Sequence, residues 1–247
     1  MAQENSEVKC KSSKRVTVIL SSVILALGIV LLGLFIRSGL NSFSANQRVV
    51  EVRGLCEREV MANKVTWPIV SKTVGNDLVA LYQEVETTNN AIVKFLKENG
   101  ITDDEISVNA PAVTDMQAES YNGEPTPFRY RVTTVVVVTS SKVQEVNALM
   151  ERQTQLMQQG IAIVAGDYNY QTLYEYTDLN KIKPEMIAEA TKNAREAANK
   201  FAEDSGSQIG TIQKATQGQF SIEDRDAYTP YMKKIRVVSY ITYFLKD

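Results

Sequence analysis

Three consecutive carboxylates, Asp103, Asp104 and Glu105, are the first residues of this sequence whose type and spacing could do chemistry. Carboxylate oxygens are the ligands that a hard cation such as calcium prefers. The twelve-residue EF-hand spacing and its glycine are absent, however, and a turn from a helix into a strand is commonly acidic and solvated. The sequence therefore favours a solvated turn, and we expect no metal site in the chain.

A second acidic group, Glu223, Asp224 and Asp226, surrounds Arg225 in what the sequence indicates is the last long loop. A solvated loop is the simplest interpretation, and a contact with a partner is the alternative.

Four tyrosines, Tyr168, Tyr170, Tyr174 and Tyr176, follow one another at even spacings. Aromatic side chains on a strand can stack on bases or sugars. They more often form cross-strand pairs or interface contacts. The last 200 residues carry 22 of the 27 basic and 27 of the 29 acidic residues, so they lack the positive surface of a nucleic-acid-binding protein. We therefore expect no nucleic-acid partner.

Trp67, the one tryptophan, is expected in a core or an interface.

Catalytic motifs are missing from the sequence. The chain has no histidine, which excludes His-based triads and His-liganded metals. It has no G-x-S-x-G, P-loop, G-x-G-x-x-G or zinc spacing. Cys10 and Cys56 are the two cysteines, and Cys56 is expected to be a small buried apolar residue, with a redox-active thiol or an intermolecular bridge as the alternatives. We thus expect no catalytic residues, no cofactor and no enzyme activity, although a glycosidase-type carboxylate pair stays open.

A membrane anchor is indicated by the segment from Val16 to Ile36 (residues 16–36), which contains no charged residue. As a helix it would span about 30 Å, the thickness of the hydrocarbon core of a bilayer. Cleavage after Ser44, as in a signal peptide, is the alternative. The apolar run is longer than a signal peptide needs and Arg37 follows it directly, which favours an uncleaved anchor.

The charges beside this segment predict its orientation. Residues 1–15 form a basic tail with four Lys or Arg side chains and two glutamates. Such a tail stays in the cytoplasm, so the rest of the chain should lie outside the inner membrane. Residues 37–48 would be a tether, and residues 49–247 one exported domain.

The exported part is expected to be an α+β domain of mixed or antiparallel sheets with about three helices packed on them. Alternating apolar residues indicate strands and a 3.6-residue period indicates helices. Three helices are expected: residues 76–99 with Asn76 as cap, a segment up to residue 159 with a Ser141–Gln144 capping box, and one opened by Pro184. Strands are expected at residues 49–60, 65–74, 107–114, 128–139, 161–176 (one or two), 208–216 and 233–245.

Two prolines and two connections complete this prediction. Pro68 is expected at an edge or a bulge, because it cannot donate a ladder hydrogen bond. Pro111 should interrupt the strand at residues 107–114. Residues 116–127 are expected to be a loop or a hairpin connection, and residues 217–231 a loop.

The order of these segments resembles the SIMPL family of bacterial envelope proteins. Val52-Arg53-Gly54-Leu55-Cys56-Glu57 is similar to the family's Val-x-Gly-x-Gly-Glu start, with Cys56 in place of the second glycine. Further similar stretches are Gly100-Ile101 with Asp104-Glu105-Ile106, Phe128-Arg129-Tyr130-Arg131-Val132, and the alanine-rich helix from Ala188 to Ala202 followed by Gly206 and Gly210. The resemblance implies an exported protein, in some members a ring- or channel-shaped oligomer linked to oxidative-stress tolerance, and it supplies no catalytic residue set.

Three hypotheses about function follow from the anchor, the missing motifs and the resemblance. The first is a non-enzymatic envelope protein that self-associates, or scaffolds an envelope protein partner, and supports stress tolerance. The second is a binding module for a small ligand or a cell-wall fragment, which requires a concave pocket with converging polar groups. The third is an unrecognised hydrolase, which requires clustered carboxylates with perturbed pKa values in a cleft.

Overall fold

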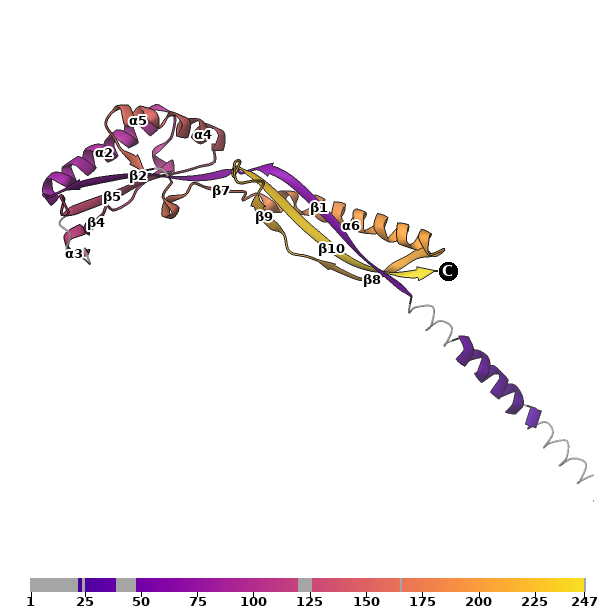
Figure 1. Cartoon of the computed structure of the whole chain (residues 1–247). Coiled ribbons are helices and arrows are strands. Elements are labelled where there is room, and N and C mark those ends of the chain that lie inside the picture. The colour runs from indigo at the N-terminus through magenta and orange to yellow at the C-terminus, as the bar shows by residue number, and fades with distance from the viewer. Residues whose placement is uncertain (1–21, 24, 39–47, 120–125, 165, 247) are drawn as a thin grey trace, which may run out of the picture. The chain divides into compact units, whose positions relative to one another are not determined.

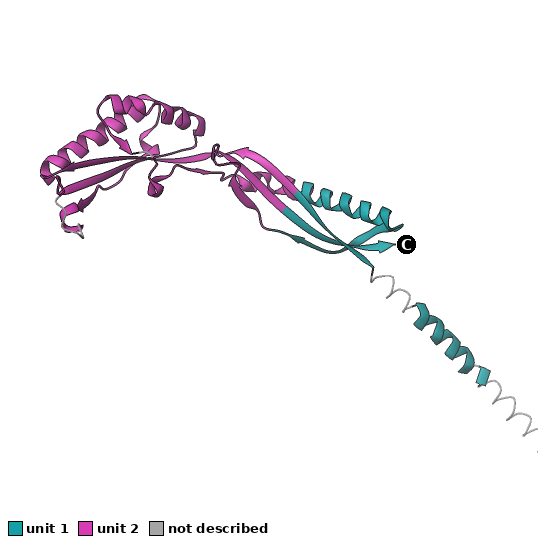
Figure 2. Ribbon diagram, viewed as in Figure 1, with its two compact units in different colours: residues 1–55, 189–218, 238–247 teal, residues 56–188, 219–237 magenta. Residues whose placement is uncertain are grey.

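The computed structural model describes residues 22–23, 25–38, 48–119, 126–164 and 166–246 (Figure 1). These residues fall into two compact units (Figure 2). Unit 1 holds the described residues of Met1–Leu55, Glu189–Gly218 and Val238–Asp247, and unit 2 holds those of Cys56–Ala188 and Gln219–Val237. Each unit is described by itself below.

The centre of unit 2 is a pair of long strands, β2 (Lys64–Gly75) and β5 (Tyr130–Ser140). They pair antiparallel over eleven residues each, from Val65 opposite Ser140 to Gly75 opposite Tyr130. Both strands are rich in β-branched residues, which pack well on a pleated surface. The strand predicted at residues 128–139 and that at residues 65–74 are thereby confirmed.

Short strands flank this pair on both sides. On the β5 side, β3 (Ile106–Val108) and β4 (Ala112–Asp115) pair with different parts of β5. On the β2 side, β6 (Ile163–Val164) and β7 (Leu173–Glu175) pair with different parts of β2. All these pairings are antiparallel, and the sheet order is β3-β5-β2-β6. Pro111 lies between β3 and β4, as predicted.

The prediction that Pro68 lies at an edge or a bulge was wrong, because β2 is an interior strand. Pro68 keeps its register opposite Val137 of β5. On the other side of β2, β7 pairs with residues 64–66 and β6 with residues 70–71, so Pro68 lies between these two short partners. A proline that lacks an N–H is tolerated there because no continuous strand runs along that side.

Helices cover one face of the six-stranded sheet in unit 2: α2 (Leu78–Glu98), α4 (Val143–Arg152) and α5 (Thr154–Gln158) (Figure 1). Their apolar faces and the facing strand residues form one buried cluster, which includes Val65, Trp67, Ile69, Ile92, Phe95, Leu96, Val136, Val138, Val146, Leu149 and Leu156. Short helical turns lie at η1 (Asp103–Glu105), α3 (Met116–Glu119) and η2 (Tyr168–Tyr170).

The second sheet has the order β1-β10-β8, with β9 also paired to β10. Its strands are β1 (Val49–Met61), β8 (Gln208–Gln217), β9 (Ser221–Asp224) and β10 (Met232–Lys246). β1, β10 and the long helix α6 (Leu179–Asp204) have residues in both units. In unit 1, Ala194 and Ala198 of α6 pack on Val52, Ile241 and Tyr243.

The small side chains let α6 lie very close to β1. A Cβ atom added to Gly54 would stand 1.8 Å from the carbonyl oxygen of Ala190 and 2.5 Å from the backbone nitrogen of Ala194. Backbone atoms cannot rotate away from such an overlap. Glycine is therefore required at this position of β1 by the approach of the helix.

The α+β class with antiparallel sheets and several helices is confirmed, whereas several predicted helix ends were wrong. The first helix is capped by Asp77, whose side chain accepts hydrogen bonds from the Val79 and Ala80 amides, and not by Asn76. The expected Ser141–Gln144 capping box does not form: the cap position is Lys142, and the helix is broken into α4 and α5 at Gln153. Pro184 lies inside α6, which begins five residues earlier at Leu179.

The expected loop at residues 217–231 contains the strand β9, which pairs with β10. This strand was missed because Ile222 is its only large apolar residue, so the segment has no alternating pattern. Two strands, β6 and β7, lie within the range expected to hold one or two.

The anchor predicted at residues 16–36 lies partly outside the described residues, since 16–21 and 24 are not among them. Residues 22–23 and 25–38 are helical. Within the part of the chain that the structure describes, no helix combines the length and apolarity needed to cross a membrane.

We expect Gly54→Ala to lower the free energy of unfolding by about 3 kcal/mol, at the upper end for overpacking, because β1 and α6 must separate. Gly75→Ala is the matched control. Its Cβ would meet the Leu81 side chain at 3.1 Å, and that side chain can adjust, so a loss of about 1 kcal/mol or less is expected. Urea unfolding followed by circular dichroism measures both, and equal losses would contradict the close approach.

Candidate functional site

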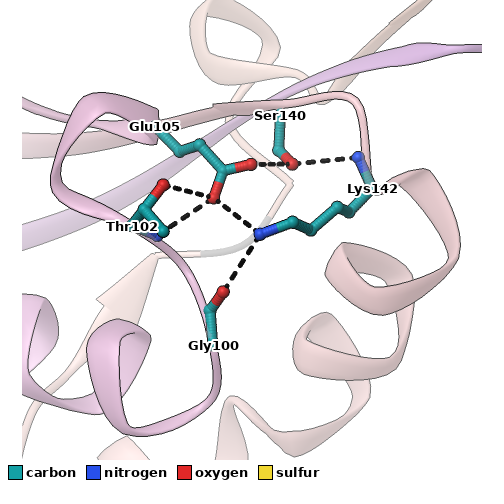
Figure 3. A network of polar contacts seen from close by, with 5 residues as sticks. All are labelled: Gly100, Thr102, Glu105, Ser140 and Lys142. Carbon is teal, nitrogen blue, oxygen red and sulfur yellow. Dashed lines mark hydrogen bonds and ion pairs between the residues drawn. The ribbon is translucent and has the colours of Figure 1, made fainter.

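The carboxylate of Glu105 accepts four hydrogen bonds (Figure 3). Its Oε1 atom accepts a hydrogen bond from the Ser140 hydroxyl at 2.6 Å. Its Oε2 atom accepts from the Thr102 amide at 3.0 Å, the Thr102 hydroxyl at 3.0 Å and the Lys142 ammonium at 3.2 Å. Lys142 also donates to the carbonyl oxygen of Gly100 at 3.2 Å. We call these five residues the Glu105 network.

The Glu105 network joins four elements of unit 2. Gly100 follows α2, Glu105 ends η1, Ser140 ends β5, and Lys142 precedes α4. The Ser140 hydroxyl also accepts a hydrogen bond from the Lys142 amide at 3.0 Å, which satisfies a backbone donor at the start of α4.

These donors lower the pKa of Glu105 to about 2, chiefly through the Ser140 hydroxyl and then the Thr102 amide. The Glu105 side chain is only 13% exposed, so the charge is held away from water and stabilised by fixed donors. A carboxylate held in this way stabilises the contact between the elements that supply its donors. It is a weak base for proton transfer near neutral pH.

The other two carboxylates of the predicted cluster point to different partners. Asp103 forms an ion pair with Lys97 at 2.5 Å, and Asp104 is exposed. The three side chains therefore do not converge. Among the described residues, no group of three His, Cys, Asp or Glu side chains is placed to hold a metal ion.

The second acidic group shapes the turn between β9 and β10. Asp226 accepts hydrogen bonds from the Tyr228 and Thr229 amides, each at 2.8 Å, and from the Thr229 hydroxyl. Arg225 donates to Asp226 at 3.0 Å and pairs with Glu59 at 3.5 Å. The Thr229 hydroxyl and then Arg225 hold the pKa of Asp226 well below its usual range.

This turn presents an aromatic residue to solvent. Asp224 pairs with Lys233 across the hairpin, and Tyr228 at the tip is 93% exposed. A loop fixed by internal hydrogen bonds and carrying an exposed tyrosine fits the partner-contact alternative, since tyrosine is enriched at binding surfaces.

The four tyrosines of the predicted series do not form one surface. Tyr174 lies edge-on to Tyr231, with ring centroids 6.2 Å apart, and donates its hydroxyl to Asn147 at 2.6 Å. Tyr168, in contrast, is 86% exposed on η2. Tyr174 packs against the buried cluster of unit 2, and burial raises its pKa.

Trp67 is buried, as expected, and also borders a hollow of about 300 Å³ in unit 2. We call it the Trp67 hollow. It lies where β2 has no partner between β6 and β7. Its lining combines aromatic and apolar side chains with two amides, two hydroxyls and one carboxylate: Trp67, Pro68, Met150, Gln153, Ile163, Val164, Gly166, Asp167, Tyr170, Gln171 and Thr172.

Asp167 is the charged group of the Trp67 hollow. Lys72 donates to it at 3.0 Å, and the Asn169 amide donates at 3.1 Å. These donors lower the pKa of Asp167, Lys72 being the largest cause. The site thus has polar groups whose orientation is already fixed.

A second concavity of about 490 Å³ runs between α2 and the edge of the six-stranded sheet. We call it the α2 groove. It was not predicted, because the sequence does not show which apolar residues of an amphipathic helix stay exposed. It is lined by Val79, Tyr82, Gln83, Val85, Glu86, Asn89, Asn90, Val93, Val108, Asn109 and Pro111.

Cys56 is 2% exposed, which confirms the prediction of a small buried residue.

The protein has an α+β fold with two antiparallel sheets and with helices on one face of the larger sheet. The charged groups of Glu105 and Asp226 form hydrogen bonds within the protein. The SIMPL family, described as a protein of unknown function (DUF541), matches residues 50–238. The chain therefore belongs to the SIMPL family, and the resemblance seen in the sequence is confirmed. No curated protein matches the chain.

We expect Glu105→Gln to lower the free energy of unfolding by about 2 kcal/mol at pH 7, because charge-assisted hydrogen bonds are lost. The folded-state pKa of about 2 lies below the ordinary 4.5, so this stability is present above pH 4.5 and is lost as the pH falls towards 2. The difference between wild type and variant should therefore become small near pH 2 and vanish below it.

Urea titrations at several pH values measure this effect. Asp104→Asn is the control, since it removes one exposed carboxylate from the same turn. A pH-independent difference between wild type and Glu105→Gln would contradict the role of the ionised carboxylate.

Proposed function

We propose that this protein is a non-enzymatic envelope protein, held in the inner membrane by one N-terminal helix, whose SIMPL body lies outside the cytoplasm and self-associates or scaffolds an envelope partner. The observation that carries the proposal is the apolar N-terminal helix. Its side chains from Val23 to Ile36 include ten large apolar residues, and each is 48–76% exposed.

Such a surface is unstable in water. An aqueous helix buries its apolar stripe against the rest of the protein, but here apolar side chains lie all round the helix. Lipid is the solvent in which that pattern is stable. The four basic residues of the tail support the orientation, because basic residues stay on the cytoplasmic side.

Two features of the body support a scaffold or assembly role. Its strongly perturbed carboxylates, Glu105 and Asp226, are ionised acceptors of structural hydrogen bonds. Large side chains also remain exposed on it, including Tyr228 at 93%, Tyr168 at 86% and Phe201 at 61%. Aromatic residues of this kind are enriched in interfaces between proteins. The proposed link to stress tolerance rests on the family resemblance alone.

Crosslinking tests topology and self-association together. A membrane-impermeant amine-reactive crosslinker is added to cells whose outer envelope has been opened, and also to lysed cells. Lys94, Lys192 and Lys200, with side chains 73–76% exposed, provide amines on the body. We expect multiples of the monomer mass in both samples, because the body is already outside the inner membrane.

Other outcomes separate the two parts of the proposal. Multimers found only after lysis would place the body inside the cytoplasm and contradict the topology. Modified monomer without multimers would contradict self-association. A variant with glutamine at Lys9, Lys11, Lys14 and Arg15 is the control, and fewer of its molecules should be reached in unlysed cells.

A second candidate function, binding of a small ligand or cell-wall fragment, is supported by the Trp67 hollow. Small-molecule sites combine apolar surface with fixed polar groups, and this hollow contains both, although more of its exposed lining is polar than apolar. Its volume of about 300 Å³ lies at the lower end of the usual range for ligand sites.

Trp67 is the one tryptophan of the chain, so its fluorescence reports directly on this hollow. We expect muramyl dipeptide, used as a cell-wall probe, to change the emission saturably, and Gln153→Ala to weaken the effect about tenfold. Asn90→Ala, outside the hollow, is the control. An emission that stays constant through millimolar probe would exclude this ligand class from the hollow.

A further inference from the structure

The α2 groove has the length and the walls of a peptide-binding site. One wall is the face of α2 from Val79 to Val93, which are fourteen residues apart and so about 21 Å along the helix axis. The other wall is the sheet edge from Val108 to Pro111. An extended chain rises about 3.3 Å per residue, so the groove accommodates about six extended residues.

The sheet edge directs backbone hydrogen-bonding groups away from β5. The Asn109 amide donates to the carbonyl oxygen of Val135 in β5 at 3.0 Å. In an antiparallel ladder, successive residues direct their N–H and C=O groups to opposite sides. The backbone groups of Val108, and by the same alternation those of Ile106, therefore point outward. Among the described strands, β3 is the last of its sheet on this side.

Apart from Glu86, the side chains of the groove are apolar or neutral. Val79, Tyr82 and Val108 are 69%, 49% and 49% exposed, so their apolar surface is uncovered. Four carboxamides and a single carboxylate, Glu86, complete the polar part of the lining.

Asn89 is one of these carboxamides and has a fixed orientation. Its Oδ1 atom accepts a hydrogen bond from the hydroxyl of Thr134 at 3.0 Å, and Thr134 is buried. The Asn89 amide nitrogen is therefore left as a donor, since the oxygen is already bonded.

We propose that the α2 groove binds a short extended peptide, uncharged and with apolar side chains at alternate positions, which adds a strand to β3. Backbone pairing would come from Ile106 and Val108, and alternate peptide side chains would contact Val79, Tyr82 and Val93. Strand addition at a sheet edge is an established mode of peptide recognition in which backbone bonds give affinity and alternate pockets give specificity.

The interrupted edge favours a peptide over a second copy of this chain. The register of β3 with β5 differs by one residue from that of β4 with β5, and Pro111 lies at this break. The break limits continuous outward pairing to the short stretch around β3. A short ladder suits a peptide that also fills the groove, whereas a sheet shared between two copies requires a longer regular edge.

The full chain in mild detergent, immobilised by a C-terminal tag, is used to select from a phage-displayed library of random heptapeptides. We expect enriched peptides with alternating apolar residues and no acidic residue. One enriched peptide is then synthesised with a fluorophore, and its affinity for each variant is measured by fluorescence anisotropy.

Two matched pairs of variants test the geometry. Val79→Lys places a charge in the groove and should weaken binding at least about tenfold, whereas Thr87→Lys, an exposed position of α2 outside the groove, should leave it within about twofold. Val108→Pro removes the outward N–H and should weaken binding about tenfold, whereas Val108→Ala keeps that donor and should weaken it about threefold. Circular dichroism confirms that each variant is folded.

Several results would overturn the proposal. These are the absence of any enriched peptide, equal binding to Val79→Lys and Thr87→Lys, or equal binding to Val108→Pro and Val108→Ala. Light scattering adds one more: if Val79→Lys separates an oligomer of the full chain and no peptide binds, the groove is a contact between copies.

Discussion

The antiparallel pairing of β2 with β5 is the interaction on which unit 2 depends. Eleven residues of each strand are in register, and the buried cluster under α2, α4 and α5 is built on their shared face. The flanking strands are short and interrupted, so this pair alone runs the length of the sheet. Both concavities lie at the interruptions, the Trp67 hollow beside Pro68 and the α2 groove beside Pro111. Candidate binding surfaces in this fold are thus places where the ladder stops.

Unit 1 is organised by a different constraint, the distance between a helix and a strand. Alanines on α6 and glycine on β1 remove the side chains that normally separate such elements. Asn193 of α6 then reaches the carbonyl oxygen of Leu55 in β1 at 2.8 Å. This gives a physical reason for Gly54 within the segment that resembles the start of the SIMPL pattern, since any larger residue would displace the helix backbone.

The long elements could be predicted from the sequence because periodicity reports burial directly. β1, β2, β5, β8, β10 and α2 lie where alternation or a 3.6-residue period placed them. Helix ends were less predictable. Asn76 and Asp77 are both good cap residues, and a tertiary contact determines which of them caps α2. Asn76 accepts a hydrogen bond from the Arg129 amide, so Asp77 is the cap. The candidate sites were not predictable. Glu105 forms hydrogen bonds with Ser140 and Lys142, which are 35 and 37 residues away in the sequence. No local sequence pattern indicates these contacts.

The broken edge formed by β3, Pro111 and β4 also bears on how unit 2 behaves when many copies are close together. A long, regular sheet edge is a template on which other chains can add without limit, and crowding raises that risk. A one-residue change of register together with a proline stops such growth after a few hydrogen bonds. The same irregularity that leaves room for a short peptide therefore limits the addition of further strands at this edge of the sheet.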